Sequence, residues 1–214
     1  MLTVHHLGRS QSERIVWLSE ELGIPYELRR YERDPVTILA PPEYRALHPI
    51  GAAPVITEGD LVLAESGAIA EYLLARHDVG HRLARGPDHP DFAAYLYWFH
   101  FANGTLQPVM GRRSLLRRAG TPEDHPAALF VQERLGRALG HVEARLGEAD
   151  HLAGREFTAA DIMAVFSLTT MRSFAPVDLA PHPNIRAYLQ RIGARDAYRR
   201  AMRKGDPGME PMLA

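Results

Sequence analysis

The chain has 214 residues, 46% of them hydrophobic, and a formal net charge of −1 at pH 7. This length and composition allow one large core or two smaller ones, and the near-neutral charge offers no field that would attract nucleic acid or an acidic membrane surface. The chain contains no cysteine, which excludes disulfides, thiolate zinc sites and a cysteine nucleophile, and fits a reducing compartment.

Two further absences bear on where the protein works. The first residues lead directly into a strand-like run and show no signal-peptide pattern. No apolar run approaches the ~20 residues that a membrane span requires. We therefore expect a cytoplasmic protein without a membrane span.

The N-terminal part predicts a β-α-β unit. Residues 2–7 form a β-prone run, residues 8–12 a polar loop, and residues 13–22 carry apolar side chains at helical spacing. Gly23 follows as a typical helix end, and residues 26–31 alternate as a second strand. A strand, a helix and a strand in so short a segment predict a parallel pair.

A proline-rich connection, with one or two helical turns at residues 42–47, leads to a β-β-α unit. Residues 55–58 and 61–64 read as strands joined by a Gly59-Asp60 turn, and residues 68–76 as a helix. Pro54 directly precedes the first of these strands and is a candidate for a cis peptide bond, since cis bonds occur almost only before proline.

The second half predicts helices alone. Glycine, proline, histidine and aspartate dominate residues 79–91, so we place a linker there between domains of residues 1–78 and 92–214. Within the long apolar stretch of residues 92–118, Pro108 predicts a kink or break. The residues after Gly205 are expected to be loosely held. The other predicted helices cover residues 126–146, 158–174 (buried all round), 184–192 and 197–203.

The clearest local signature in this half is a capping box. Thr158 is the N-cap and Asp161, three residues later, takes the place of the commoner glutamate, while Phe157 can pack on Ile162 as a hydrophobic staple. Loss of the threonine cap is expected to cost on the order of 1 kcal/mol. We interpret this motif as structural.

The sequence resembles the glutathione S-transferase superfamily. In that family a cis-proline precedes the third strand, as Ala53-Pro54-Val55 suggests here, and a Glu/Gln-Ser pair, here Glu65-Ser66, opens the following helix. The resemblance covers essentially the whole chain. It implies an α/β thioredoxin-like domain followed by an all-α helical-bundle domain.

The resemblance also implies a way to activate the thiol of glutathione. The tyrosine position of the family falls near His5 or His6, and the cysteine class is excluded by composition, which leaves the serine-type branch with its Ser-x-Ser-x-Arg loop. We predict Ser10 as the thiolate donor and hold Ser12 as the second candidate. Either serine can instead be a simple helix cap.

Further glutathione contacts follow from the resemblance. The backbone of Val55 is expected to pair with the cysteinyl backbone of glutathione, and the helix start at Ser66 to hold its γ-glutamyl carboxylate. Many relatives carry lysine in the turn where this chain has Ala52 and Ala53, so the glycyl carboxylate needs another partner. The predicted glutathione-binding residues are Val55, Pro54, Glu65, Ser66, His48 and Arg45.

The implied activity is transfer of glutathione to a small hydrophobic electrophile, as in detoxification, with glutathione-dependent peroxidase activity from the same parts. The alternative is a non-catalytic binding or interaction protein of the same fold. The implied assembly is a homodimer. The electrophile pocket is expected near Arg9, with His100, Asn103, Gln107 and Met110 as its lining.

Two other features suggest no function. His77, His81 and His89 do not have the spacing of metal ligands, and the adjacent His5 and His6 point to opposite faces of a strand, so we predict no metal site. The arginines at 112–113 and 117–118 lie at a predicted helix end, where the dipole favours cations. We therefore predict no nucleic-acid binding.

Overall fold

The computed structural model describes residues 1–214, and its packing divides the chain into two compact units. The first comprises residues 1–84 and 193–211, and the second residues 85–192 and 212–214. This division groups the helix at residues 196–205 with the N-terminal unit, whereas the sequence-based domain limits put it in the all-α part. The domain limits themselves stay predictions, and each unit is described by itself.

The first unit is built on a four-stranded mixed sheet in the order β2-β1-β3-β4. β1 runs parallel to β2 and antiparallel to β3, and β3 and β4 form a hairpin. Gly59 in the hairpin turn has a φ of 59°, a conformation that favours glycine. The predicted strands and the parallel pair are confirmed. The strands are β1 (Leu2–Leu7), β2 (Glu27–Tyr31), β3 (Val55–Glu58) and β4 (Leu61–Ala64).

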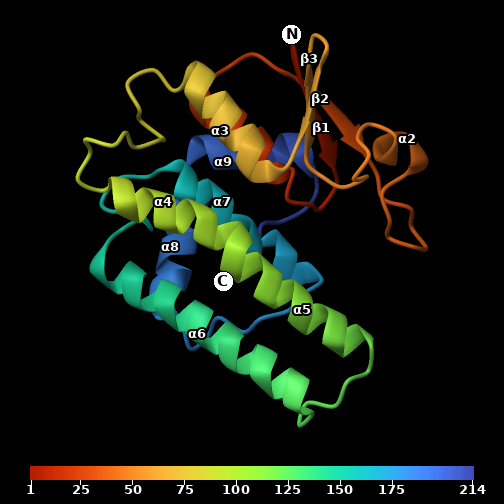
Figure 1. Cartoon of the computed structure of the whole chain (residues 1–214), viewed down its shortest axis with the longest axis vertical. Coiled ribbons are helices and arrows are strands. Elements are labelled where there is room, and N and C mark those ends of the chain that lie inside the picture. The colour runs from red at the N-terminus through yellow and green to blue at the C-terminus, as the bar shows by residue number, and fades with distance from the viewer. The chain divides into compact units, whose positions relative to one another are not determined.

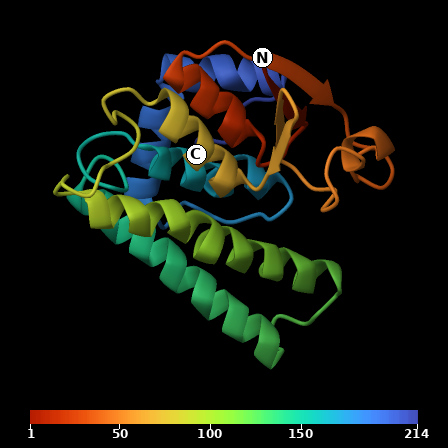
Figure 2. The same cartoon turned by 45° about the horizontal axis from the view of Figure 1, so that its top comes forward.

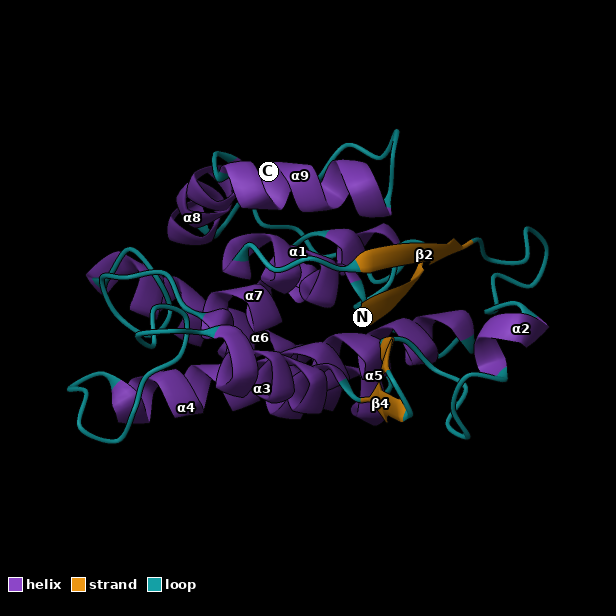
Figure 3. Cartoon of the chain, turned by 90° about the horizontal axis from the view of Figure 1, so that it is seen from above, coloured by secondary structure: helices purple, strands orange, loops and turns teal.

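Helices cover both faces of this sheet (Figures 1 and 3). α1 (Glu13–Leu22), α3 (Ser66–His77) and α9 (Asp196–Gly205) lie on one side, and the short α2 (Pro42–Arg45) lies on the other. α9 packs along α1. Arg195 donates two hydrogen bonds of 2.8 Å each to the carboxylate of Glu21 in α1. A fork-shaped guanidinium pair of this kind fixes geometry as well as charge.

The alternation of β1 directs its two adjacent histidines to opposite faces, as predicted. His5 lies on the side of α2, where it bonds Tyr31 in a core that also holds Tyr44. His6 lies on the side of α1 and α9 and is 0% exposed. These two buried histidines therefore have separate surroundings.

The second unit is helical (Figure 2). The long stretch with Pro108 is interrupted as predicted: α4 ends at Phe101, five residues form a π-helix, and α5 begins at Gln107. A proline lacks the N–H that would continue the helical ladder. None of the helices is long and apolar enough to cross a bilayer. The elements are α4 (Phe92–Phe101), η1 (Ala102–Leu106), α5 (Gln107–Arg118), α6 (Pro126–Glu148), α7 (Ala159–Leu168), η2 (Thr170–Ser173) and α8 (Pro183–Gly193).

α7 is buried along all ten residues, although it is shorter than predicted because the α-helix ends at Leu168. The capping box is confirmed: Thr158 Oγ1 accepts from Ala160 N–H at 3.3 Å, and Asp161 Oδ2 accepts from Thr158 N–H at 2.9 Å. Asp161 Oδ1 accepts two further bonds, from Leu152 N–H at 3.0 Å and from Tyr188 O–H at 2.9 Å. One carboxylate thus joins three segments of the unit.

Candidate functional site

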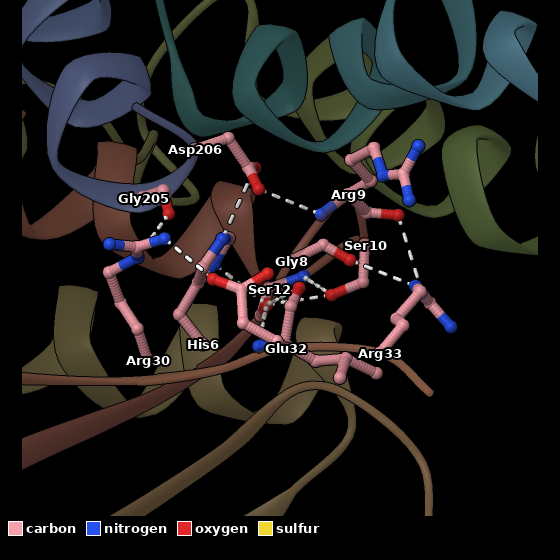
Figure 4. Close-up of polar contacts among 11 residues, drawn as sticks. His6, Gly8, Arg9, Ser10, Ser12, Arg30, Glu32, Arg33, Gly205 and Asp206 are labelled. Atoms are coloured by element: carbon pink, nitrogen blue, oxygen red, sulfur yellow. Dashed lines mark hydrogen bonds and ion pairs between the residues drawn. The ribbon is translucent and has the colours of Figure 1, made fainter. Parts of the chain in front are cut away.

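A row of hydrogen-bonded side chains gathers where β1 ends and α1 begins (Figure 4). Ser10 Oγ lies 2.7 Å from Ser12 Oγ, which in turn lies 2.9 Å from Nδ1 of His6 and accepts the N–H of Leu7 at 3.1 Å. Ser12 is 0% exposed and Ser10 is 5% exposed. Ser12 is therefore enclosed by protein atoms, while Ser10 lies at the outer end of the row.

The two serines do not act as ordinary caps of α1. Ser12 occupies the N-cap position but its side chain makes no capping bond to the helix. Its own N–H instead donates to Ser10 Oγ at 3.2 Å. The interpretation of Ser12 as a helix cap is therefore wrong, because its hydroxyl is used by β1 and Ser10.

At the other end of the row, His6 reaches a carboxylate from the C-terminal segment. Nε2 of His6 donates to Oδ2 of Asp206 at 3.2 Å, and the N–H of Arg9 donates to Oδ1 at 2.9 Å. Gly205 permits this approach, since a Cβ there would lie 3.2 Å from the imidazole nitrogen. Asp206 is 8% exposed, so the prediction of a loosely held tail is wrong at this residue.

The charge of Asp206 depends on these partners. Burial alone would raise the pKa of its carboxyl, but the hydrogen bond from His6, with help from the N–H of Arg9, holds that pKa below its usual value. The carboxylate is therefore ionised, and because it can only accept, His6 carries a proton on Nε2.

The lowered pKa of Asp206 predicts an acid-dependent contribution to stability. A carboxyl whose pKa is depressed by folding stabilises the native state above its unfolded pKa of about 3.9 and loses that contribution as pH falls through the folded value. We expect Asp206→Asn to be less stable than wild type by on the order of 1 kcal/mol at pH 7. Urea unfolding at pH 7 and pH 3 tests this; an equal deficit at both pH values contradicts it.

A second network ties three segments together beside Ser10. Gln11 Nε2 donates to the carbonyl of Ala53, which precedes the cis bond to Pro54. Nη1 of Arg14 donates to Gln11 Oε1 at 2.9 Å and to Oγ of Ser66, the first residue of α3, at 3.3 Å. The start of α1, the cis-proline turn and the start of α3 thus meet at one place.

Arg14 brings a buried positive charge to this place. Its side chain is 1% exposed, and burial lowers the pKa of the guanidinium to about 9, with Glu13 opposing the shift. At neutral pH the group remains a cation. Sequence reasoning did not assign Gln11 and Arg14 to the site, although both belong to the Ser-x-Ser-x-Arg motif that it singled out.

The start of α3 has the features of an anion site. The first N–H groups of a helix have no partner within it, and the helix dipole is positive there. Ser66 is buried at this end, and Glu65 before it is exposed with a φ of 73°, a conformation that costs a non-glycine residue on the order of 1–3 kcal/mol. Such strain at a helix start is commonly retained for a function.

The structure does not favour the predicted contact between the backbone of Val55 and that of glutathione. Val55 pairs with His5 of β1 on one side and with Ala64 of β4 on the other, and is 1% exposed. β3 therefore offers no free edge there for another peptide backbone. Ala53 lies outside the strand and is half-buried, which makes it the better candidate for that contact.

The candidates for a glycyl carboxylate lie before this turn. Arg45, the last residue of α2, is exposed. His48 is half-buried, and its Nδ1 accepts the N–H of Ile50 at 3.3 Å, which leaves Nε2 of its ring for a ligand. Both positions suit an anion, and their role stays a prediction.

The comparisons with known proteins agree with this geometry. Residues 1–75 match the model of the glutathione S-transferase N-terminal domain, and residues 98–196 match that of its C-terminal domain. A solved glutathione S-transferase from Actinobacillus pleuropneumoniae is 35% identical, with a TM-score of 0.89, and covers 98% of this chain and 95% of its own. The chain belongs to the glutathione S-transferase superfamily. Its thioredoxin-like N-terminal and helical C-terminal parts are those of the superfamily.

Curated members of the superfamily differ in what their names describe. Glutathione S-transferase 3 of Schizosaccharomyces pombe is 29% identical over 95% of this chain and 88% of its own length. FtsZ-localized protein A of Caulobacter vibrioides is 28% identical over 98% of this chain and 94% of its own. Similarity to these relatives thus supports the fold and, at the level of the family, a glutathione-transferase chemistry. The activity of this chain has to be argued from its own site.

The predicted electrophile residues are spread over both units. In the first unit, Arg9 is exposed with a φ of 51°, and it lines a cavity of about 560 Å³ with Arg30, Arg33, Asp206 and other residues. Charged side chains line much of this cavity, which is not what a hydrophobic electrophile favours. In the second unit, His100 is exposed, Asn103 and Gln107 are half-buried, and Met110 is buried. A shared pocket for them stays a prediction.

Proposed function

We propose that this protein is a glutathione transferase that stabilises the thiolate of glutathione with Ser10 and adds it to a small hydrophobic electrophile. One observation carries this proposal: a serine hydroxyl at the start of α1 stands at the outer end of a buried hydrogen-bonded row, beside the network of Gln11, Arg14 and Ser66. A thiol bound between these two networks meets both a hydroxyl donor and a helix N-terminus.

The parts for holding glutathione are arranged around that hydroxyl. The γ-glutamyl carboxylate is assigned to the N–H groups and hydroxyl at Ser66, with the cation of Arg14 close by. The cysteinyl backbone is assigned to Ala53, next to the cis-proline, and the glycyl carboxylate to Arg45 and His48. Each part of the tripeptide then has a group of matching polarity.

The thiol chemistry sets the energy that the site must supply. An unperturbed thiol has a pKa of about 8.5, and lowering it by two units corresponds to roughly 2.7 kcal/mol. Hydrogen bonds to a charged acceptor contribute about 1.5–3 kcal/mol each, so one well-placed hydroxyl and a helix start are sufficient. Neither metal nor redox cofactor is needed for this step.

Ser66 provides a test of the carboxylate site. We expect Ser66→Ala to weaken glutathione binding about 10-fold, because one hydrogen bond to a charged group is lost. Calorimetric titration measures the dissociation constant. Ser19→Ala is the matched control, since Ser19 is a buried serine of α1 whose hydroxyl bonds only the carbonyl of Ile15 among the contacts described here. Equal affinities of wild type and Ser66→Ala would place the carboxylate elsewhere.

The function itself is tested by turnover. The purified protein is assayed with glutathione and a panel of hydrophobic aryl halides, epoxides and organic peroxides, with product formation followed against the uncatalysed rate. The proposal predicts saturable transfer to at least one class, and peroxide reduction would add the second activity of the same thiolate. Glutathione binding without any transfer would contradict it.

The similarity to FtsZ-localized protein A gives the second candidate, a non-catalytic interaction protein of this fold. That function predicts no lowering of the thiol pKa and no turnover, with binding of a protein partner instead.

We further propose a homodimer, as is typical of the superfamily, and a cytoplasmic location. Sedimentation equilibrium measures the first of these directly.

A further inference from the structure

Behind Ser10 lies a buried row of hydrogen bonds whose role is not explained by thiolate stabilisation alone. Ser10, Ser12, His6 and Asp206 form one unbroken row of hydrogen bonds of 2.7, 2.9 and 3.2 Å (Figure 4). The row joins the start of α1, β1 and the segment after α9, and its members His6 and Asp206 lie 200 positions apart in sequence. Its members are 5%, 0%, 0% and 8% exposed. A histidine–carboxylate pair of this kind has the parts of a proton acceptor.

The directions of the hydrogen bonds in the row follow from Asp206 at its inner end and from the shorter of the two contacts that Ser12 can donate to. Asp206 only accepts, so His6 donates from Nε2 and its Nδ1 is an acceptor. Ser12 has two acceptors within reach, Nδ1 of His6 at 2.9 Å and the carbonyl of Leu7 at 3.3 Å, and we assign its single proton to the shorter contact, with Nδ1; it accepts from Leu7 N–H and from Ser10. Ser10 consequently donates inward to Ser12. In this state its oxygen, and not its proton, faces outward.

We propose that His6, acting through Ser12 and Ser10, receives the thiol proton of glutathione. This inference rests on the proposed function and deepens it. The S–H bond breaks as its proton passes to Ser10 Oγ; the proton of Ser10 passes to Ser12 Oγ, and that of Ser12 to Nδ1 of His6. The electron pair of the S–H bond stays on sulfur. The products are a thiolate and an imidazolium, with no proton exchanged with solvent.

The shift reverses the row and completes the thiolate site. The imidazolium donates from both nitrogens, to Asp206 and to Ser12. Ser12 then donates to Ser10, and Ser10 donates outward to the thiolate. Asp206 stabilises the imidazolium as an ionised partner in hydrogen-bond contact. The same transfer that removes the thiol proton therefore also turns Ser10 into a hydrogen-bond donor for sulfur.

Other charged groups on the neighbouring elements are engaged with partners of their own. None of them replaces Asp206, which is hydrogen-bonded directly to His6. Arg30 of β2 pairs with Glu32 and Lys204 of α9 with Glu20 of α1, while Arg14 of α1 donates to Gln11 and Ser66.

Proton counting on wild-type protein tests the relay. Glutathione is titrated at pH 6.5 in two buffers of different ionisation enthalpy, and the thiolate is measured by its ultraviolet absorbance in the same samples. The relay predicts a thiolate band with close to zero protons released per thiolate formed. About one proton released per thiolate would overturn the relay while leaving thiolate formation, and with it the proposed function, intact. No thiolate band would overturn both.

Nitrogen NMR of histidine-labelled protein identifies the acceptor. His6 is expected to be the neutral Nε2–H tautomer in the free protein and an imidazolium with glutathione, its signals being assigned by their loss in His6→Gln. S-methylglutathione is the matched ligand, because it has no thiol proton, and it should leave His6 neutral. A His6 signal that is unchanged by glutathione would contradict the relay.

Variants separate a positioning role from a merely structural one. Asp206→Asn and His6→Gln are expected to release about one proton per thiolate formed, unlike wild type. His5→Gln is the matched control: His5 is also buried and bonds Tyr31 and Thr57, but it faces the other side of the sheet. His5→Gln should still release close to zero protons per thiolate formed. If it released as many protons as His6→Gln, the assignment of His6 as the proton acceptor would be contradicted. Should a variant fail to fold, the wild-type measurements above still decide.

Discussion

Ser10→Ala is expected to lower kcat/KM for glutathione transfer about 50- to 100-fold at pH 6.5, because two pKa units on the thiol correspond to roughly 2.7 kcal/mol. The hydroxyl of Ser10 is the outermost one in the row. Alanine can neither donate a hydrogen bond to sulfur nor pass on the proton of the thiol. The loss should shrink as pH rises towards the pKa of the free thiol, since the thiolate then forms without help. Initial rates over pH 6–9 measure it.

Ser19→Ala serves as the control for this prediction also. It makes the same substitution at a buried serine of α1, the helix that Ser10 precedes, so it corrects for packing loss. Its kcat/KM should remain within about twofold of wild type. A Ser10→Ala enzyme with an unchanged pH–rate profile would remove Ser10 from the mechanism.

Asp161→Ala is expected to lower the free energy of unfolding by about 3–5 kcal/mol, as buried donors lose their charged partner. The carboxylate accepts from Thr158, Leu152 and Tyr188, at 2.9, 3.0 and 2.9 Å, and is 0% exposed. This exceeds the effect of an ordinary helix cap, about 1 kcal/mol. Urea unfolding followed by circular dichroism gives the value.

Asp178→Ala is the matched control, because Asp178 also accepts a backbone N–H, that of Ala180 at 2.8 Å, but at an exposed site. Its loss should cost at most about 1 kcal/mol, since water replaces the missing partner. Similar losses for the two variants would show that the three bonds of Asp161 contribute no more than a surface cap.

Local patterns were sufficient for the elements and for the capping box. Strand alternation, helical spacing and turn residues act over a few positions, so β1, α1, the β3–β4 hairpin and Thr158–Asp161 could be predicted from neighbours alone. Pro108 and the cis bond before Pro54 were predictable for the same reason, because proline restricts its own backbone. The helix at 158–174 was predicted too long because apolar composition does not tell an α-helix from a 3₁₀ turn.

The candidate site depended on contacts that sequence spacing does not encode. Asp206 meets His6 only because α9 packs along α1, and no local pattern links residues at opposite ends of the chain. Arg14 lay inside a recognised motif, yet its reach to Ser66 depends on where α3 begins. Val55 was favoured by its place after the proline, but the strand order puts β3 between two other strands.

The most direct test of the account is the pKa of the glutathione thiol on wild-type protein, measured from thiolate absorbance between pH 5 and pH 10. A site built from Ser10 and the start of α1 predicts ionisation about two units below the value of the free thiol. Bound glutathione that ionises at the same pH as free glutathione would contradict the account and favour a binding protein of the same fold.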